Sequence, residues 1–376
     1  MKILIVVTKS EIGGVQVFVL NLARALKEIG YNVEVAAGEG NYLSNELTKE
    51  TIPFHYLDSL KRNASIFASF YFIYDLHKLL KKNNYDLLHL NSSNALLGTL
   101  SRKFLQRQPK IVFTFHGLSV VDKNYETHPL NKLISKLYFK IFLKTPDRNV
   151  FVSRINYRES MENGIVKSAD VIYNGLDEAR MHFLNREESR QYLSKKCNYD
   201  LSGKFLIGSI GRLAYQKNYD FLIQHYSKIK NEIQDAKIVI IGDGPYAERF
   251  SREVKEMGIE KDLFFTGAVE NSYQYLKAFD LFTLPSHHEG LPISLIEALI
   301  AGLPILASDV GGNREIVNNS PEQLFRLNDI DDYLNKLREI VKNLERISGY
   351  NLSLKNNFTL DKMVKEYKSI YDSLFK

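Results

Sequence analysis

The sequence predicts two α/β domains in tandem, each built on a doubly wound parallel sheet. The chain has 376 residues, enough for two or three domains. Short β-branched runs alternate with helical stretches through both halves, the pattern of parallel βαβ units. At 44% hydrophobic and 25% charged residues, the composition is that of a globular protein and not of a disordered one.

The first series of elements extends to about residue 176. Ile3 to Val7 is a continuous apolar run, typical of a strand buried on both faces. It leads through Gly13-Gly14 into a helix that stops at Gly30, and a further apolar helix is predicted over 65–82. Other strands of this series are predicted at 33–36, 86–90, 111–115, 148–152 and 171–173.

The second series begins after about residue 177. Its predicted strands are 205–210, 237–241, 263–266, 281–284 and 305–307, and its predicted helices are 218–229, 245–257, 272–278 and 292–301. The polar stretch 175–203 is the predicted hinge, and 359–375 is predicted to form an amphipathic helix. In doubly wound sheets ligands bind beyond the carboxyl ends of the strands, so we expect the chemistry in the strand-to-helix loops.

Composition and charge narrow the classes of protein. The longest uncharged apolar stretch is twelve residues, whereas a membrane-spanning helix needs about twenty. The apolar run near the N-terminus is too short for a signal peptide, and the single Cys197 excludes a disulfide framework, so a reducing cytoplasm is expected. Of the net charge of +6, residues 1–180 contribute +7 and the rest −1, which favours an anionic partner for the first domain.

The strongest motif is a pair of glutamates, Glu289 and Glu297, separated by seven residues. It follows the predicted strand 281–284, and Pro292 suits the first turn of a helix. The backbone N–H groups of Gly290 and Leu291 would then form an anion site at the helix N-terminus. On a helix the two Cα atoms would lie roughly 12 Å apart, so the two glutamates could bind the two ends of one elongated ligand. A surface loop would explain Glu289 alone, but Glu297 sits in an apolar helix and should be partnered or functional.

Two cations in one strand-to-helix loop form a second motif. Arg212 and Lys217 follow the predicted strand 205–210, and together they suit a diphosphate. Two solvated loop cations would look the same, but the neighbouring glutamate motif favours the functional interpretation.

Weaker candidates follow other strands. Gly14 opens a helix and could let the backbone approach a phosphate, although a simple turn has the same sequence. Gly242 and Val269 could line a base pocket or belong to tight turns. His116 follows the predicted strand 111–115 and could hydrogen-bond a sugar, or merely cap a turn.

Metal and nucleotide motifs of other classes are absent or out of context. His287-His288-Glu289-Gly290-Leu291 does not match HExxH, and no Walker A loop occurs. Asp329-Ile330-Asp331 is formally DxD, but its place before a helical run indicates N-capping. We therefore expect no metal site.

On these motifs the chain resembles glycosyltransferase family 4, a large group of retaining nucleotide-sugar transferases with the GT-B fold. The resemblance spans nearly the whole chain and is loose only at about 40–80 and 118–147. The matching segments are 289–297 with 302–304, 308–315, Gly211-Arg212 with Lys217-Asn218, 241–245, 174–177, Gly13-Gly14, 86–89 and His116.

The resemblance implies two Rossmann-like domains facing a central cleft. The first, 1–176, would be the acceptor side and would be joined by the C-terminal helix 359–376, and the second, 177–358, would bind the nucleotide sugar. Arg212, Lys217 and the backbone at Gly14 would bind the donor diphosphate, Glu297 the ribose, and Gly242 and Val269 the base. Glu289 and the backbone of Gly290, Leu291, Pro292 and Ile293 would hold the donor sugar and distal phosphate. His116 would approach the reacting sugar, so His116 and Glu289 are the expected catalytic residues.

The implied reaction retains the anomeric configuration and needs no metal or other cofactor, because Arg212, Lys217 and the helix N-terminus take up the leaving-group charge. It would move a hexosyl or N-acetylhexosaminyl group, from UDP by family frequency, to a glycan or lipid-linked acceptor. The products would be cell-envelope polysaccharide, capsule or lipopolysaccharide. A nucleotide-sugar 2-epimerase or another GT-B enzyme stays open as the alternative. Nucleic-acid binding is not expected, because no groove-reading or stacking module is found.

A basic stripe in the first half suggests a further partner. Lys132, Lys136, Lys140 and Lys144 recur every four residues, and the apolar residues between them are expected to pack on the opposite, buried side of a helix. These apolar residues are Leu133, Ile134, Leu137, Tyr138, Ile141 and Phe142. Such a stripe suits an anionic membrane surface at the inner face of the cell membrane, and equally a plain solvated helix.

Overall fold

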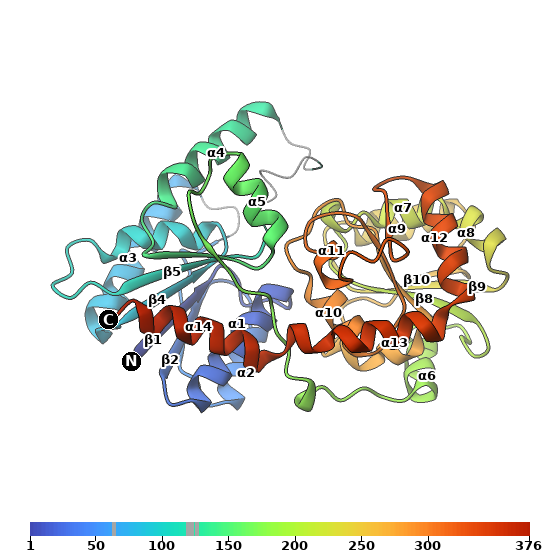
Figure 1. The fold of residues 1–376 in the computed structure, drawn as a ribbon, viewed down its shortest axis with the longest axis horizontal. Helices are drawn as coiled ribbons and strands as arrows, with labels where there is room; N and C mark the ends of the chain where they lie inside the picture. Colours follow the sequence, from blue (N-terminus) through green and yellow to red (C-terminus); the bar gives the residue numbers. More distant parts are fainter. Residues whose placement is uncertain (62–64, 118–123, 125–127) are drawn as a thin grey trace. The chain divides into compact units, whose positions relative to one another are not determined.

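The computed structural model describes residues 1–61, 65–117, 124 and 128–376, which form two compact units (Figure 1). Unit 1 comprises Met1–Leu176 together with Phe358–Lys376, and unit 2 comprises Asp177–Asn357. Each unit is a parallel sheet with helices packed on it, so the predicted α/β class is confirmed.

Unit 1 has a seven-stranded sheet in the order β3-β2-β1-β4-β5-β6-β7. The strands are β1 (Lys2–Val7), β2 (Asn32–Ala37), β3 (Phe54–Tyr56), β4 (Leu87–Asn91), β5 (Lys110–Phe115), β6 (Arg148–Phe151) and β7 (Asp170–Val171). The helices are α1 (Gly14–Glu28), α2 (Tyr42–Lys49), α3 (Ile66–Asn83), α4 (Pro129–Phe142), α5 (Arg154–Glu162), α14 (Leu360–Ser373) and the 3₁₀ helix η1 (Asn94–Arg102).

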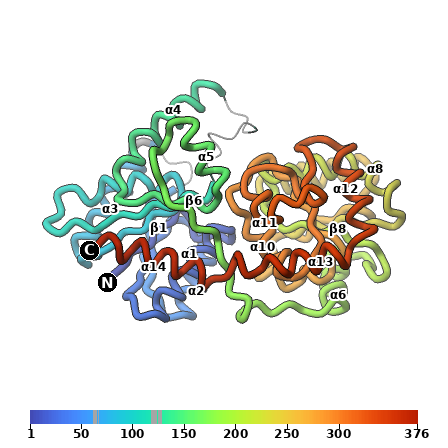
Figure 2. Tube along the Cα trace, viewed as in Figure 1, coloured from blue at the N-terminus to red at the C-terminus, as the bar shows by residue number. Residues whose placement is uncertain are grey.

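Two hydrophobic clusters cover the two faces of this sheet. One face packs against α1, α2 and α14, and the other packs against α3, η1 and α4. The last helix therefore returns to unit 1 (red in Figure 2), where Tyr371 Oη lies 2.7 Å from Nδ1 of the buried His89. A strand buried on both faces explains the continuous apolar sequence of β1, in which Ile3 to Val7 are at most 1% exposed.

Unit 2 has a six-stranded parallel sheet in the order β10-β9-β8-β11-β12-β13. The strands are β8 (Phe205–Ile210), β9 (Ala236–Ile241), β10 (Leu263–Phe265), β11 (Leu281–Leu284), β12 (Ile305–Ser308) and β13 (Leu324–Phe325). The α-helices are α6 (Arg186–Cys197), α7 (Tyr219–Gln224), α8 (Tyr226–Glu232), α9 (Ala247–Glu256), α10 (Ile293–Ile300), α11 (Asn313–Ile316), α12 (Ile330–Lys342) and α13 (Leu344–Leu354). The 3₁₀ helices are η3 (Glu178–Arg180), η4 (Tyr215–Lys217), η5 (Ser272–Ala278) and η6 (Lys355–Phe358), the last of which ends at the unit boundary.

Two local predictions for unit 2 need correction. The boundary between the units, after Leu176, falls within the predicted hinge 175–203, but this stretch is not irregular throughout, because α6 lies within it and packs against η5. A capping box between Asn185 and Glu188 starts α6, and the buried Arg190 ties it to Asp280 at 2.8 Å. The predicted helix 218–229 is broken into α7 and α8 at His225, whereas the predicted helical stretch 272–278 is confirmed and is a 3₁₀ helix.

The inward side of α4 also differs from the prediction. Phe139 and Leu143 are buried against the sheet, whereas Leu133, Leu137 and Ile141 are 64%, 56% and 51% exposed. The helix meets the core through the side that carries Phe139 and Leu143, which are four residues apart and therefore share a face. The remaining residues of the predicted buried side divide between an exposed Ile134 and partly buried Tyr138 and Phe142.

Among the helices of the described residues, none is long and apolar enough to cross a membrane.

Candidate active site

The carboxyl ends of the central strands carry the predicted site residues of each unit. The strand order reverses at β1 in unit 1 and at β8 in unit 2, and crevices at such switch points are where doubly wound sheets bind ligands. Gly14 follows β1 and His116 follows β5, while Arg212 and Lys217 follow β8 and Glu289 follows β11. The topology thus gathers these loops at one edge of their own sheet.

In unit 2 the carboxylate of Glu289 is held by three side chains. Lys217 Nζ lies 2.6 Å from Oε1, and both side chains are largely buried. Ser286 Oγ donates to the same oxygen at 2.7 Å, and Gln216 Nε2 donates to Oε2 at 3.3 Å. A carboxylate fixed in this way is oriented before any ligand arrives. Ser286 and Gln216 belong to no motif, so the sequence reasoning missed them.

Gly311 and Gly312 pack closely against the backbone of the loop that carries Glu289. A Cβ on Gly311 would lie 2.0 Å from the carbonyl oxygen of Glu289, and one on Gly312 would lie 2.0 Å from that of Gly290. The N–H of Gly312 donates to the Gly290 oxygen at 2.9 Å. Any larger residue would push this loop away from the start of α10, so the glycines follow from close backbone approach.

The start of α10 adds backbone donors beside this pair. Gly290, Leu291 and Ile293 are buried, and Pro292 is the N-cap residue just before the helix. The first N–H groups of an α-helix have no acceptor within the helix, and the helix dipole favours negative charge there. Lys217 has three N–H donors, of which one is directed at Glu289. The Lys217 ammonium and the N–H groups at the start of α10 can therefore bind an anion together.

Glu297 differs from Glu289 in having no hydrogen-bond partner for its carboxylate in the described part of the chain. It is 8% exposed within the apolar α10, and no described residue donates a hydrogen bond to its carboxylate. Burial disfavours the charged form and raises the pKa of Glu297 to about 7. A buried carboxylate without a donor is disfavoured unless a ligand supplies hydroxyl or amide groups.

The loops after β8, β9 and β10 interlock beside this cluster. A Cβ on Gly242 would lie 1.9 Å from the carbonyl oxygen of Gly211, and the Gly242 N–H donates to the Gly267 oxygen at 3.0 Å. Val269 is buried two residues further on, whereas Arg212 is exposed in its loop. Gly242 therefore has a packing role whether or not it also touches a ligand.

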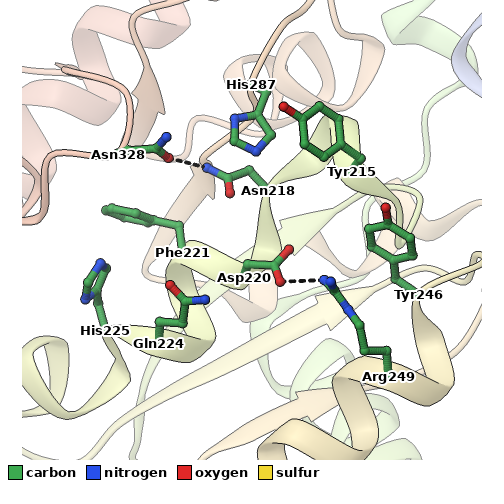
Figure 3. A pocket seen from close by; sticks show the side chains of 10 residues that line it. All are labelled: Tyr215, Asn218, Asp220, Phe221, Gln224, His225, Tyr246, Arg249, His287 and Asn328. Carbon is green, nitrogen blue, oxygen red and sulfur yellow. Dashed lines mark hydrogen bonds and ion pairs between the residues drawn. The ribbon is translucent and has the colours of Figure 1, made fainter. Parts of the chain in front are cut away.

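A cavity of about 460 Å³ lies next to the loop that carries Lys217 (Figure 3). The ring of Tyr215 stacks on that of His287 with centroids 4.5 Å apart, and Asn218 Nδ2 donates to Asn328 Oδ1 at 2.9 Å. The lining consists of Tyr215, Asn218, Asp220, Phe221, Gln224, His225, Tyr246, Arg249, His287 and Asn328. None of the predicted site residues lines it, so this cavity is separate from the Lys217–Glu289 pair.

In unit 1, His116 lies at the end of β5 beside the buried Asn91. Its Nε2 is 2.9 Å from Oδ1 of Asn91, and its ring packs edge-on against Phe18 with centroids 4.5 Å apart. Burial lowers the pKa of His116 to about 3, so the imidazole is neutral at neutral pH. With the amide oxygen facing it, Nε2 carries the proton and Nδ1 is left as an acceptor. Gly14 is the first residue of α1 and directly follows the loop after β1.

Replacing Asn91 tests whether this proton placement matters. In Asn91→Asp a carboxylate beside Nε2 should favour the imidazolium and raise the pKa of His116. We expect activity to fall at acidic and neutral pH and to recover at alkaline pH, with the rate at pH 7 at least about tenfold lower. The check is the pH–rate profile, with Asn83→Ala on the far end of α3 as control. An unchanged profile would mean that Asn91 does not set the state of His116.

Two protein-family models match the chain: Glycosyltransferase Family 4 over residues 12–180, and Glycosyl transferases group 1 over residues 194–351. The chain belongs to glycosyltransferase family 4. It is therefore a glycosyltransferase of the GT-B type, as the sequence motifs predicted.

Relatives and solved structures agree along the full length of the enzyme. It is 29% identical to the UDP-Gal:alpha-D-GlcNAc-diphosphoundecaprenol alpha-1,3-galactosyltransferase of Escherichia coli, over 96% of this chain and 94% of that protein. It is 25% identical to the capsular polysaccharide biosynthesis glycosyltransferase CapH of Staphylococcus aureus, over 99% of each. The crystal structure of Anabaena HepE with UDP and glucose superposes with a TM-score of 0.81 at 17% identity, over 99% of this chain and 100% of that one. At this identity the superposition shows the fold alone.

Proposed function

We propose that the enzyme transfers a hexosyl or N-acetylhexosaminyl group from a UDP-sugar to a lipid-linked or glycan acceptor of a cell-envelope polysaccharide. The observation that carries the proposal is the buried Lys217–Glu289 pair at the start of α10, with the unpartnered Glu297 farther along the same helix. A cation beside the N–H groups of a helix N-terminus suits a diphosphate, and a carboxylate without a donor among the described residues suits the two hydroxyls of a ribose.

The donor and acceptor classes are supported by similar proteins. The E. coli relative is named for a UDP-galactose donor and a diphosphoundecaprenol-linked acceptor, CapH for capsule synthesis, and HepE is crystallised with UDP. A lipid-linked acceptor would place the enzyme at a membrane surface, and the lysines Lys132, Lys136, Lys140 and Lys144 suit one that is anionic.

The proposed roles divide the chemistry between residues of this chain. Lys217, Arg212 and the helix N-terminus would stabilise the diphosphate as negative charge develops on it, which removes the need for a metal ion. Glu289, held by Ser286 and Gln216, would accept hydrogen bonds from the donor sugar. His116, through its unprotonated Nδ1, would accept one from a sugar hydroxyl. Retention of the anomeric configuration is carried over from the family resemblance.

A thermal-shift panel followed by product analysis tests the proposal. We expect UDP to raise the melting temperature by several degrees, GDP and ADP to do so far less, and EDTA to change nothing. NMR of the product should show the anomeric configuration of the donor. A 2-epimerase would instead convert the UDP-sugar without acceptor. Stabilisation by GDP alone, or loss of turnover in EDTA, would contradict the donor or the metal independence respectively.

A further inference from the structure

The surface of unit 1 carries an unusual concentration of exposed apolar side chains. Of the seventeen large hydrophobic residues exposed among the described residues, ten come from α3, the loop after η1, and α4, and unit 2 contributes only two. We call these ten the apolar face: Phe67, Phe70, Tyr71, Tyr74, Phe104, Leu130, Leu133, Ile134, Leu137 and Ile141. Both α3 and α4 contact η1, and exposed apolar side chains gathered on neighbouring elements mark an interaction site, whereas scattered residues do not.

On α4 these residues form a regular helical stripe. Leu130, Leu133, Ile134, Leu137 and Ile141 follow the i, i+3, i+4, i+7, i+11 spacing, and each is at least 51% exposed. Such a stripe normally faces a protein core. Here the core is already satisfied by the other side of the helix, where Phe139 is 5% exposed and the Tyr138 hydroxyl donates to the Ser93 carbonyl at 2.9 Å. The helix thus has a second apolar side with no partner within the described part of unit 1.

The same arrangement occurs on α3. Phe67, Phe70, Tyr71 and Tyr74 are 76%, 66%, 64% and 54% exposed, while Phe72, Leu76 and Leu80 are buried in the cluster shared with α4. Both helices therefore lie on one face of the sheet (Figure 1). Each also carries apolar side chains that are exposed and lie outside the buried cluster on that face. Phe104, in the loop after η1 between them in sequence, is 96% exposed.

The charges beside the apolar face are of one sign. The segment 129–144 has four lysines and no acidic residue, and α3 has Lys78, Lys81 and Lys82 against Asp75 alone. Lys140 and Lys144 are exposed. Two copies of this face would repel each other, whereas an anionic surface is complementary to it. Apolar and aromatic side chains bordered by lysines are the composition of helices that lie in a membrane interface.

We propose that unit 1 inserts the apolar face into the interfacial region of an anionic bilayer. This deepens the proposed function and rests on it for its purpose, since a lipid-linked acceptor is met at such a surface. Phe67 on α3 and Leu130 on α4 lie in the first turns of helices that follow strand carboxyl ends. That is the edge of the sheet at which His116 lies, so insertion there brings the acceptor lipid to the reacting end of unit 1.

Vesicle flotation with the full chain tests the insertion. The enzyme should float with vesicles of phosphatidylcholine and phosphatidylglycerol, and much less with phosphatidylcholine alone. Leu133→Ser with Leu137→Ser, or Phe70→Ser with Tyr71→Ser, should weaken binding at least about tenfold in low and high salt alike. Lys140→Gln with Lys144→Gln should weaken it in low salt only, because salt screens the lysines of the wild type as well. Since all these side chains are exposed, the variants should keep the wild-type melting temperature.

A matched control uses the exposed apolar residues of unit 2. Met257→Ser with Leu352→Ser should bind vesicles as the wild type does. The chain has no tryptophan, so Leu137→Trp and Met257→Trp each give a single reporter. Emission of the first should shift to the blue and be quenched by brominated lipid, and emission of the second should not.

Three outcomes would overturn the proposal. The serine variants could float as the wild type does, or the emission of the Leu137→Trp variant could stay unchanged on vesicles. Alternatively, sedimentation without vesicles could show a wild-type dimer that the serine variants dissociate, which would make the face a contact between copies. Failure of the proposed function is a separate result, because it would appear as absent transfer to a water-soluble acceptor analogue while flotation is intact.

Discussion

Lys217→Ala should lower kcat for sugar transfer by roughly 100- to 1000-fold. The expected size is that of losing one preorganised charge at the point where negative charge develops on a leaving group. Lys217 Nζ is 2.6 Å from Glu289, and no second acceptor for it is found among the described residues, so its other two N–H donors can serve the diphosphate. The measurement is steady-state transfer with the donor identified by the thermal-shift panel, with Lys195→Ala on the exposed side of α6 as control.

A loss of stability could imitate this result, because the variant leaves Glu289 buried without its cation. Removing one partner of a buried pair destabilises by about 3–5 kcal/mol. The double variant Lys217→Ala with Glu289→Gln removes that uncompensated charge, so it should recover most of the free energy of unfolding and none of the activity. If the double variant regained activity together with stability, or if Lys217→Ala turned over at the wild-type rate, the assigned role would be wrong.

Glu297→Gln should make the unliganded enzyme more stable at pH 8 while it weakens nucleotide binding. Burial raises the pKa of Glu297 to about 7 from an ordinary value of 4.5. Between these values the folded state holds a proton that the unfolded state has released, so stability falls as pH rises from about 4.5 to about 7. The full difference is on the order of 3 kcal/mol, which the amide should recover at pH 8 and not at pH 4.5. Urea unfolding at both pH values measures it.

The binding half of this prediction has its own ligand control. A ribose diol donating to the carboxylate should lower the pKa of Glu297, so UDP should bind more tightly as pH rises through 7. The 2′,3′-dideoxy analogue of UDP shares the phosphate titration and lacks those hydroxyls. We expect the wild type to prefer UDP by about ten- to a hundredfold, and Glu297→Gln to lose that preference. Equal preference in both proteins would remove Glu297 from the ribose site.

If Glu297→Gln stabilises the protein and weakens nucleotide binding, the binding function explains why a buried carboxyl is kept in an apolar helix. The charged carboxylate of Glu297 lowers the stability of the fold, because it is buried without a hydrogen-bond donor among the described residues. Glu289 is different, since Lys217, Ser286 and Gln216 compensate it in the folded chain.

The sequence by itself determined the α/β class, most of the strands and the loops that carry the site. Strands such as β1 are apolar throughout because both faces are buried, and the loops between strand and helix hold the charged and glycine residues. The Glu289–Glu297 spacing could be recognised because polar residues within an apolar run need a reason. These signals depend only on residues that are close together along the chain, so they can be recognised in the sequence.

Only the tertiary structure decided which side chains contact Glu289 and which side of α4 packs against the sheet. Ser286 and Gln216 meet Glu289 through the neighbouring strands β11 and β8, and Gly311 and Gly312 are required by a backbone that passes 22 residues away in sequence. The sequence of α4 has apolar residues on two sides, so periodicity cannot say which one meets the sheet. In the structure Phe139 and Leu143 pack in the core, whereas Leu133 and Leu137, which were predicted to be buried, are exposed.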